Sequence, residues 1–352
     1  MPSSNSTVRP FSIPTAKRAR FASLGRLVLG CFALMLVNGA RADELPSTGA
    51  IVLENPSVRL EFVPKIGRVM FFGFRDGENF LWVNNQEDLI YEYNLGGWRN
   101  YGGEKIWPGP QALWAFAQGR GWPPDPDLDG SGVESVKRLS ERSITVTFPV
   151  SKIWGVQLSR TFELDEQQPL VHLRNTLTRR HGMPVPLQIW SVAQLPHPDS
   201  TWLESLTPVP TGGPYLNLNR AADKPPFTPP PLPEGSVTVH GQWTTVSAIP
   251  EQRMKVGTLG GAIAAVTPAG IFLQKVAFDK TGAYPEASSV QVLLNNRYVE
   301  IETLSPLVLL DVDESYSFDI TWALLPPTGA ATPDEIETVL NTAVERLGVE
   351  AK

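Results

Sequence analysis

Ser143-Ile144-Thr145-Val146-Thr147-Phe148 alternates polar and apolar residues, and so does Val58-Arg59-Leu60-Glu61-Phe62-Val63. Successive side chains of a strand point to opposite faces, so this period of two is typical of antiparallel strands that are buried on one side. Similar runs, separated by Gly, Pro, Asn or Asp, lie at 155–164, 170–177, 187–192, 236–240, 261–267, 271–278, 289–294, 298–304 and 315–324. No helical pattern intervenes between them, so we expect an all-β fold built as a large antiparallel sandwich.

One helix is clearly indicated, at the C-terminal end of the chain. Thr332 and Glu335 form a capping box, and Pro333 occupies the first helical position. Apolar residues then recur with the helical period until Gly348. The sequence therefore predicts a helix over 333–347.

Two segments fit neither strands nor helices. Residues 98–129 form a long irregular stretch, and residues 208–235 form another that is rich in proline. Proline removes a backbone donor and blocks strand pairing, so we expect 208–235 to be a Pro-rich surface loop. Such a loop either covers a sheet edge or binds a partner.

The first 42 residues resemble an export signal. They carry six basic and no acidic residues, an apolar run over 27–37, and a small-x-small cleavage pattern that ends at Ala42. We expect residues 1–42 to be a signal peptide and residues 43–352 to be a single periplasmic or secreted domain. Cys31 lies in a lipoprotein-like box, so a lipid anchor is the alternative, but the apolar run continues past it.

Charge and composition exclude several classes of protein. Removing residues 1–42 takes the net charge from −6 to −12, which disfavours nucleic-acid binding. The only cysteine leaves with the signal, so disulfides and thiolate chemistry are not expected. No later stretch has the roughly 20 apolar residues of a membrane-spanning helix, so we expect no transmembrane segment in the mature chain.

Four of the ten tryptophans fall within the 25 residues from Trp98 to Trp122, on a segment framed by glycine and proline. Indoles on such a loop can form a flat wall for the apolar face of a sugar ring. Polar side chains that could bond sugar hydroxyls lie beside them: Arg99, Asn100 and Lys105. A loop whose indoles pack on each other is the structural alternative. The carbohydrate hypothesis takes Trp98, Trp107, Trp122 and these three polar residues as substrate-binding.

Three runs carry a resemblance to a known family: Trp98-Arg99-Asn100-Tyr101-Gly102-Gly103-Glu104-Lys105-Ile106-Trp107-Pro108, Trp122-Pro123-Pro124-Asp125-Pro126, and Asn296-Arg297-Tyr298-Val299-Glu300-Ile301-Glu302-Thr303-Leu304-Ser305-Pro306. The chain resembles exported bacterial proteins of unknown function in the galactose mutarotase-like superfamily, over most of residues 51–325. The resemblance implies a β-supersandwich whose concave face binds sugars. The motifs that carry the resemblance do not indicate any one activity specifically.

Mutarotase chemistry needs a base and an acid, in this superfamily a carboxylate opposite a histidine. The resemblance places Trp190 where the histidine would stand, which counts against epimerase activity. It matches the general base best to Glu302. Glu300 and Glu302 alternate along one strand and therefore point to one face. Arg297 is their predicted partner and a further predicted substrate-binding residue. These two glutamates are the predicted catalytic residues, and an ordinary solvated strand face is the alternative.

A calcium hypothesis rests on Asp125-Pro126-Asp127-Leu128-Asp129-Gly130, which has the carboxylate spacing of a calcium loop. Val136 stands where an EF-hand needs glutamate, so the motif is not an EF-hand. An Asp- and Gly-rich turn is the alternative. Asp125, Asp127 and Asp129 are thus candidate metal ligands, and no other cofactor is expected.

The sequence as a whole favours an exported carbohydrate-binding protein. A sugar epimerase or polysaccharide lyase with Glu302 as the base is the first alternative, with Lys105, Tyr101 or His172 as the acid. A non-catalytic envelope structural or interaction protein is the second.

Overall fold

The computed structural model describes residues 43–44, 49–84, 98–219, 229–247, 249 and 252–350. Contacts divide the chain into residues 1–40 and 41–352, and all the described residues belong to the second unit. The predicted signal peptide and Cys31 lie outside the described residues.

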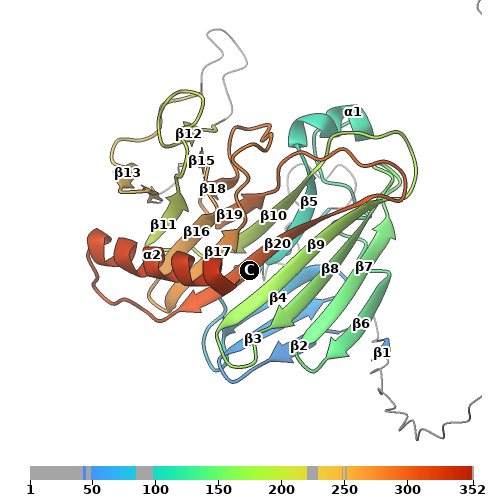
Figure 1. Ribbon diagram of the computed structural model, residues 1–352, viewed down its shortest axis with the longest axis horizontal. Coiled ribbons are helices and arrows are strands. Elements are labelled where there is room, and N and C mark those ends of the chain that lie inside the picture. The colour runs from blue at the N-terminus through green and yellow to red at the C-terminus, as the bar shows by residue number, and fades with distance from the viewer. Residues whose placement is uncertain are drawn as a thin grey trace, which may run out of the picture. The chain divides into compact units, whose positions relative to one another are not determined.

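Two antiparallel sheets form the described part of the chain (Figure 1). Sheet A has eleven described strands in the order β1 (Asp43–Glu44), β6 (Ser135–Ser140), β7 (Ser143–Val150), β8 (Val156–Leu164), β9 (Leu170–Arg179), β20 (Ser315–Leu325), β17 (Gly270–Val276), β16 (Ala262–Thr267), β11 (Ser200–Glu204), β14 (Trp243–Val246) and β13 (Val237–His240). Sheet B has nine described strands in the order β12 (Leu216–Asn217), β15 (Met254–Thr258), β18 (Val290–Leu294), β19 (Val299–Leu304), β10 (Gln188–Leu195), β5 (Glu104–Gly109), β4 (Arg68–Phe74), β3 (Val58–Val63) and β2 (Ile51–Glu54). The predicted all-β fold is confirmed, and each predicted run contains a strand.

Burial along the strands follows from what covers each face. In β3 and β8 buried residues alternate with more exposed ones, because one face packs against the opposite sheet. In β5, β10 and β19 every residue is buried. These three neighbouring strands at the centre of sheet B are therefore covered on both faces.

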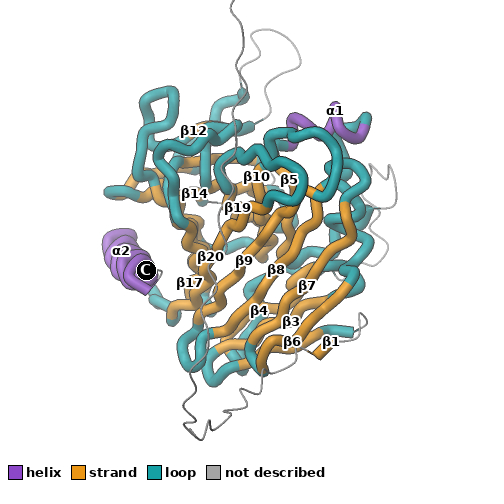
Figure 2. Tube along the Cα trace, turned by 45° about the vertical axis from the view of Figure 1, so that its right-hand side comes forward, coloured by secondary structure: helices purple, strands orange, loops and turns teal. Residues whose placement is uncertain are grey.

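The predicted helix is α2 (Pro333–Glu350), which continues past Gly348. Thr332 and Glu335 form the expected capping box, with Thr332 N donating to Glu335 Oε2 at 2.7 Å. Ile336, Leu340 and Leu347 join a second apolar cluster with residues of β9, β16 and β17. Figure 2 shows α2 on the outside of sheet A. Neither helix of the described chain has the length and hydrophobicity that crossing a membrane requires.

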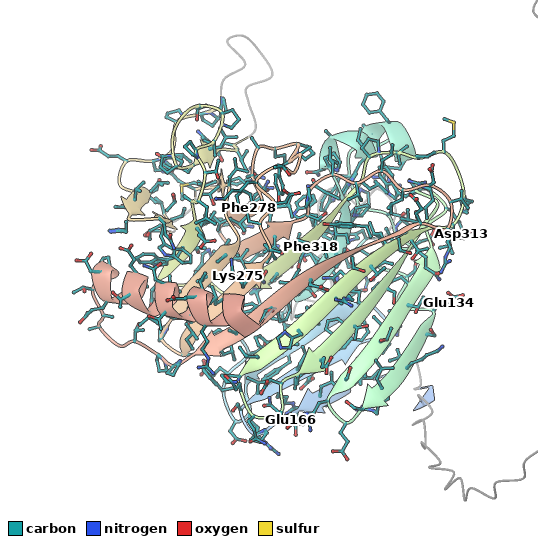
Figure 3. The ribbon with its side chains drawn as sticks, in the orientation of Figure 1. Glu134, Glu166, Lys275, Phe278, Asp313 and Phe318 are labelled. Carbon is teal, nitrogen blue, oxygen red and sulfur yellow. The ribbon has the colours of Figure 1, made fainter. Side chains whose placement is uncertain are left out.

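The expectation that 98–129 is irregular is wrong for its middle part. This segment contains β5, a 3-10 turn over Gln111–Leu113 and the short helix α1 (Trp114–Gln118). The proline-rich segment 208–235 holds the two-residue strand β12 and is otherwise irregular where it is described; residues 220–228 lie outside the described part. Figure 3 shows Glu166 and Asp313 at opposite ends of the long strands of sheet A.

A buried ion pair joins the two sheets through their common core. Arg160 of β8 donates to both carboxylate oxygens of Glu104 on β5, at 2.7 and 2.8 Å. Asn175 accepts from Arg160 at 2.8 Å, and Ser191 donates to Glu104 at 3.0 Å. These contacts tie β5 to sheet A and fix which of its side chains face inward.

Candidate functional site

The outer face of sheet B, which points away from sheet A, carries the chemistry-bearing side chains, buried beside Trp107, Trp190 and Val192 of the apolar cluster. Strand pairing aligns Lys105 on β5 with Val192 on β10, and Val192 with Glu302 on β19. Cα partners in neighbouring strands share a face, so Lys105 and Glu302 lie on the same side with Val192 between them. Glu104 precedes Lys105 and faces the opposite side, toward the core.

Glu302 is fully buried, and its two carboxylate oxygens have different surroundings. Oε2 accepts a hydrogen bond of 2.9 Å from the indole of Trp190 and lies 3.1 Å from Nζ of Lys255. Oε1 has no hydrogen-bond partner among the described residues. Burial raises the pKa of Glu302 to about 7, while the charge of Lys255 opposes the rise and that of Glu300 adds to it.

Lys105 and Glu300 form the second half of the site. Nζ of Lys105 lies 3.8 Å from Oε1 of Glu300, which accepts a hydrogen bond of 2.8 Å from Gln194. Lys105 is 1% exposed, and within the described chain its ammonium group has no hydrogen-bond partner. Burial lowers the pKa of Lys105 to about 8, against the opposing effect of Glu300.

The structure corrects the predicted partner of the two glutamates. Arg297 is exposed in the turn before β19, where its backbone N–H donates to Asn295. The cations beside Glu300 and Glu302 are Lys105 and Lys255, which come from β5 and β15. We call Lys105, Gln194, Lys255, Glu300 and Glu302 the sheet B cluster.

The tryptophans of the 98–122 segment pack mainly on one another. The ring centroid of Trp107 lies 5.8 Å from that of Trp114, 5.7 Å from that of Trp122 and 5.1 Å from that of Trp190. Trp107 is buried, whereas Trp98 and Trp122 are half-buried and meet edge to face. The expected exposed wall is therefore wrong for Trp107, and the self-packed alternative describes this segment better.

Among the contacts of the described residues, none joins Arg99 or Asn100 to the sheet B cluster. Arg99 is exposed, and Asn100 is buried with its Oδ1 accepting from the N–H of Gly102. His172, considered as an acid, is exposed on β9 of sheet A. Tyr101 lies beside the guanidinium of Arg68, 5.7 Å from the ring centroid. Of the three acids considered, Lys105 is the one on the same face as Glu302.

The three predicted calcium ligands are engaged with protein groups. Asp129 accepts two hydrogen bonds of 2.9 Å from the guanidinium group of Arg68. It also accepts hydrogen bonds from the indole N–H groups of Trp98 and Trp107, at 3.0 and 2.7 Å. Asp125 accepts from the hydroxyl of Ser151 and from the backbone of Asp127. Across the residues that the structure describes, no group of three or more metal-ligating side chains could hold an ion. The geometry gives the calcium hypothesis no support.

Sequence reasoning missed Lys255 and Gln194. Lys255 belongs to a short strand, β15, which the predicted runs do not include because its alternation covers only about four residues before Gly257. It reaches Glu302 because β15, β18 and β19 pair side by side, which aligns Lys255 with Leu293 and Leu293 with Glu300. No local signal in the sequence indicates that pairing.

The sequence pattern of a domain of unknown function, DUF4380, matches residues 49–297. The chain belongs to the DUF4380 family. Every residue of the sheet B cluster except Glu300 and Glu302 lies within the matched segment of this DUF4380 protein. No curated protein matches the chain by sequence.

Solved structures resemble the fold of this DUF4380 protein. A candidate aldose 1-epimerase of Escherichia coli K12 has a TM-score of 0.51 at 12% identity, covering 79% of this chain and 99% of its own. A candidate aldose 1-epimerase of Klebsiella pneumoniae has a TM-score of 0.50 at 12% identity, covering 77% of each chain. A TPR-domain protein of Parabacteroides distasonis has a TM-score of 0.50 at 14% identity, covering 81% of this chain and 49% of its own. The fold is galactose mutarotase-like, as the resemblance implied.

Proposed function

We propose that this DUF4380 protein binds a carbohydrate on the outer face of sheet B, between Lys105 and Glu302. The observation that carries the proposal is a set of buried polar atoms without hydrogen-bond partners among the described residues. They are Nζ of Lys105, Oε1 of Glu302 and Oε1 of Gln194. Leaving such groups unsatisfied costs about 1–3 kcal/mol each, so a ligand that both donates and accepts would relieve them. Sugar hydroxyl groups do both.

Two buried aromatic side chains border the proposed binding position. Trp107 and Trp190 are Cα partners on β5 and β10, in the row next to that of Lys105 and Val192. Both indoles are almost fully buried and pack on each other, so a sugar held between Lys105 and Glu302 would bind mainly through its hydroxyl groups to the charged residues. Solvent reaches the cluster on the side of Lys255 and Glu286, whose side chains are 11% and 35% exposed. We propose that the sugar enters there.

The test is a titration of intrinsic tryptophan fluorescence with neutral and acidic mono- and oligosaccharides. We expect a saturable change for at least one sugar, and affinity at least about tenfold weaker in Glu302→Gln, since a lost charged hydrogen bond costs about 1.5–3 kcal/mol. Glu163→Gln is the matched control, because Glu163 is an exposed strand carboxylate on sheet A. If no sugar changes the fluorescence, carbohydrate binding is refuted and the envelope interaction hypothesis takes its place.

A second candidate function is sugar epimerisation or polysaccharide cleavage with Glu302 as the base. It is favoured by the pKa of Glu302 near 7 and that of Lys105 near 8. Groups that titrate near neutral pH transfer protons efficiently, and these two lie two strand spacings apart, about 9–10 Å between Cα atoms. Polarimetry of a reducing aldose and ultraviolet absorbance of an unsaturated cleavage product test the two reactions. Wild-type rates no faster than those of Glu302→Gln would exclude both.

We also propose that the protein acts outside the cytoplasm after loss of residues 1–42. The support is the basic, apolar and small-residue pattern of that segment. N-terminal sequencing of the protein recovered from its native envelope fraction should begin at Asp43. An N-terminal acylated Cys31 would instead show a lipid anchor, and an intact Met1 would exclude export by this route.

A further inference from the structure

The sheet B cluster contains two lysines whose amino groups have different surroundings. Nζ of Lys255 is held 3.1 Å from Glu302 Oε2 and lies 5.0 Å from the ring centroid of Trp190. Nζ of Lys105 lies 3.8 Å from Oε1 of Glu300 and has no hydrogen-bond partner among the described residues. An amine that is not tied up in hydrogen bonds keeps its lone pair available once it loses a proton.

We propose that Lys105 is a nucleophilic amine that forms an imine with an aldehyde, such as the open-chain form of an aldose. The aldose as the natural aldehyde rests on the proposed carbohydrate function, whereas the reactivity of the amine does not. Nothing in the mutarotase-like fold itself requires this reaction, since opening and closing a hemiacetal needs proton transfer alone.

The reaction is balanced within the site. The nitrogen of neutral Lys105 attacks the carbonyl carbon, the C=O electron pair moves to oxygen, and a proton passes from nitrogen to that oxygen to give a carbinolamine. Loss of the hydroxyl group with one proton releases water and leaves the C=N bond, so no oxidant or reductant is consumed. Glu300 lies 3.8 Å from Nζ and can carry the proton, and Gln194 holds Glu300 in place at 2.8 Å.

The surroundings of Lys105 favour both the free amine and the cationic imine. Burial lowers the pKa of Lys105 to about 8, so a fraction of the amine is neutral at physiological pH. The ring centroid of Trp107 lies 5.1 Å from Nζ, which stabilises a positive charge on the nitrogen of the protonated imine. Val192, which is fully buried, lies between the strands of Lys105 and Glu302 and is an apolar neighbour of the site.

The experiment traps the imine by reduction. The full-length protein is incubated with glycolaldehyde and cyanoborohydride at neutral pH, digested, and mapped by mass spectrometry over time. Glycolaldehyde is used because it is the smallest aldehyde that also carries a hydroxyl group. We expect the reduced adduct to form about tenfold faster on Lys105 than on Lys255 or on Lys152, whose side chain is 89% exposed. Equal labelling of the three lysines, or labelling of exposed lysines alone, would overturn the proposal.

Two variants sharpen the result. Lys105→Met should abolish the fast adduct, and Glu300→Gln should slow it, while Glu163→Gln should leave it unchanged. If Lys105→Met does not fold, the time course on the wild-type peptides still decides between Lys105 and Lys255. Fast trapping at Lys105 without affinity for any sugar would refute the proposed function alone, and sugar binding without trapping would refute this inference alone.

Discussion

The indole of Trp190 donates a hydrogen bond of 2.9 Å to Oε2 of Glu302 on the neighbouring strand. Both side chains are buried, so the bond is shielded from water. The tryptophan thus stands beside the carboxylate that the resemblance matched to a general base. It can donate a hydrogen bond but has no titratable proton, so it supports the charge of Glu302 without replacing a histidine acid.

Trp190→Phe should therefore raise the pKa of Glu302 above about 7. The substitution removes a donor to the charged form of the carboxylate, which makes ionisation harder. Carboxyl carbon NMR titration of labelled glutamate measures the change. Trp202→Phe, on sheet A, serves as the control because its indole donates to Ser200. An unchanged or lower pKa in Trp190→Phe would show that this bond does not favour the carboxylate.

Glu302 should make the folded protein less stable as the pH rises toward neutrality. Its pKa is raised from 4.5 to about 7, so its contribution to stability is complete below pH 4.5 and is lost as the pH rises through about 7. Relative to Glu302→Gln, the free energy of unfolding of the wild type should fall over that interval by on the order of 3 kcal/mol. Urea unfolding across the pH range measures it, and parallel curves for the two proteins would contradict the expectation.

Lys105 should act in the opposite direction at higher pH. Its pKa is lowered from 10.5 to about 8, so its contribution to stability is present above pH 10.5 and is lost as the pH falls through about 8. Between these two pH values the free energy of unfolding should rise in the wild type. The rise should exceed that of Lys105→Met by on the order of 3 kcal/mol. Urea unfolding in alkaline buffers gives the comparison. Lys137→Met, on the exposed part of β6, should retain the wild-type rise.

Asp129→Asn should destabilise the protein because Arg68 would lose its buried counter-ion. Both side chains of the pair are fully buried. Leaving a buried charge unpaired costs about 3–5 kcal/mol, which thermal unfolding would reveal as a large drop in Tm. Calcium and chelator should leave the wild-type Tm unchanged, since the carboxylate is occupied by Arg68. A rise in Tm with calcium would restore the metal hypothesis.

Glu104→Gln should be about as costly, because it leaves Arg160 without its carboxylate partner between the sheets. We expect a loss of about 3–5 kcal/mol in urea unfolding. The double variant Glu104→Met/Arg160→Met removes both charges. It should therefore recover part of the lost free energy of unfolding. If the double variant is as unstable as the sum of the single variants, the two side chains do not act as a pair.

How far the sequence predicts the fold depends on how each strand is covered. β3, β7 and β8 have one face toward the core, so their alternation is visible in the sequence and their prediction is confirmed. β5 is buried on both faces and ends in Pro108 and Gly109, so it shows no period of two and resembles a loop. For that reason the sequence predicts Trp107, which lies in β5, to be a loop residue.

In the candidate site, contacts between residues close in sequence are predictable, whereas contacts between distant residues are not. The shared face of Glu300 and Glu302 is a local property of β19 and was predicted from alternation. Their partners are not local, since Lys105 and Lys255 reach them through strand pairings that the sequence does not encode as a motif. The prediction that Arg297, which is near them in sequence, is their partner is wrong.

Glu104 and Lys105 are consecutive residues of one strand, one facing the core and the other the sheet B cluster. A deletion of a single residue just before them would exchange their directions, bringing the ammonium group against Arg160 and the carboxylate against Glu300. Two attractive pairs would become two repulsive ones. Natural variation in this strand should therefore be confined to substitutions, with changes of length displaced into the loops at either end.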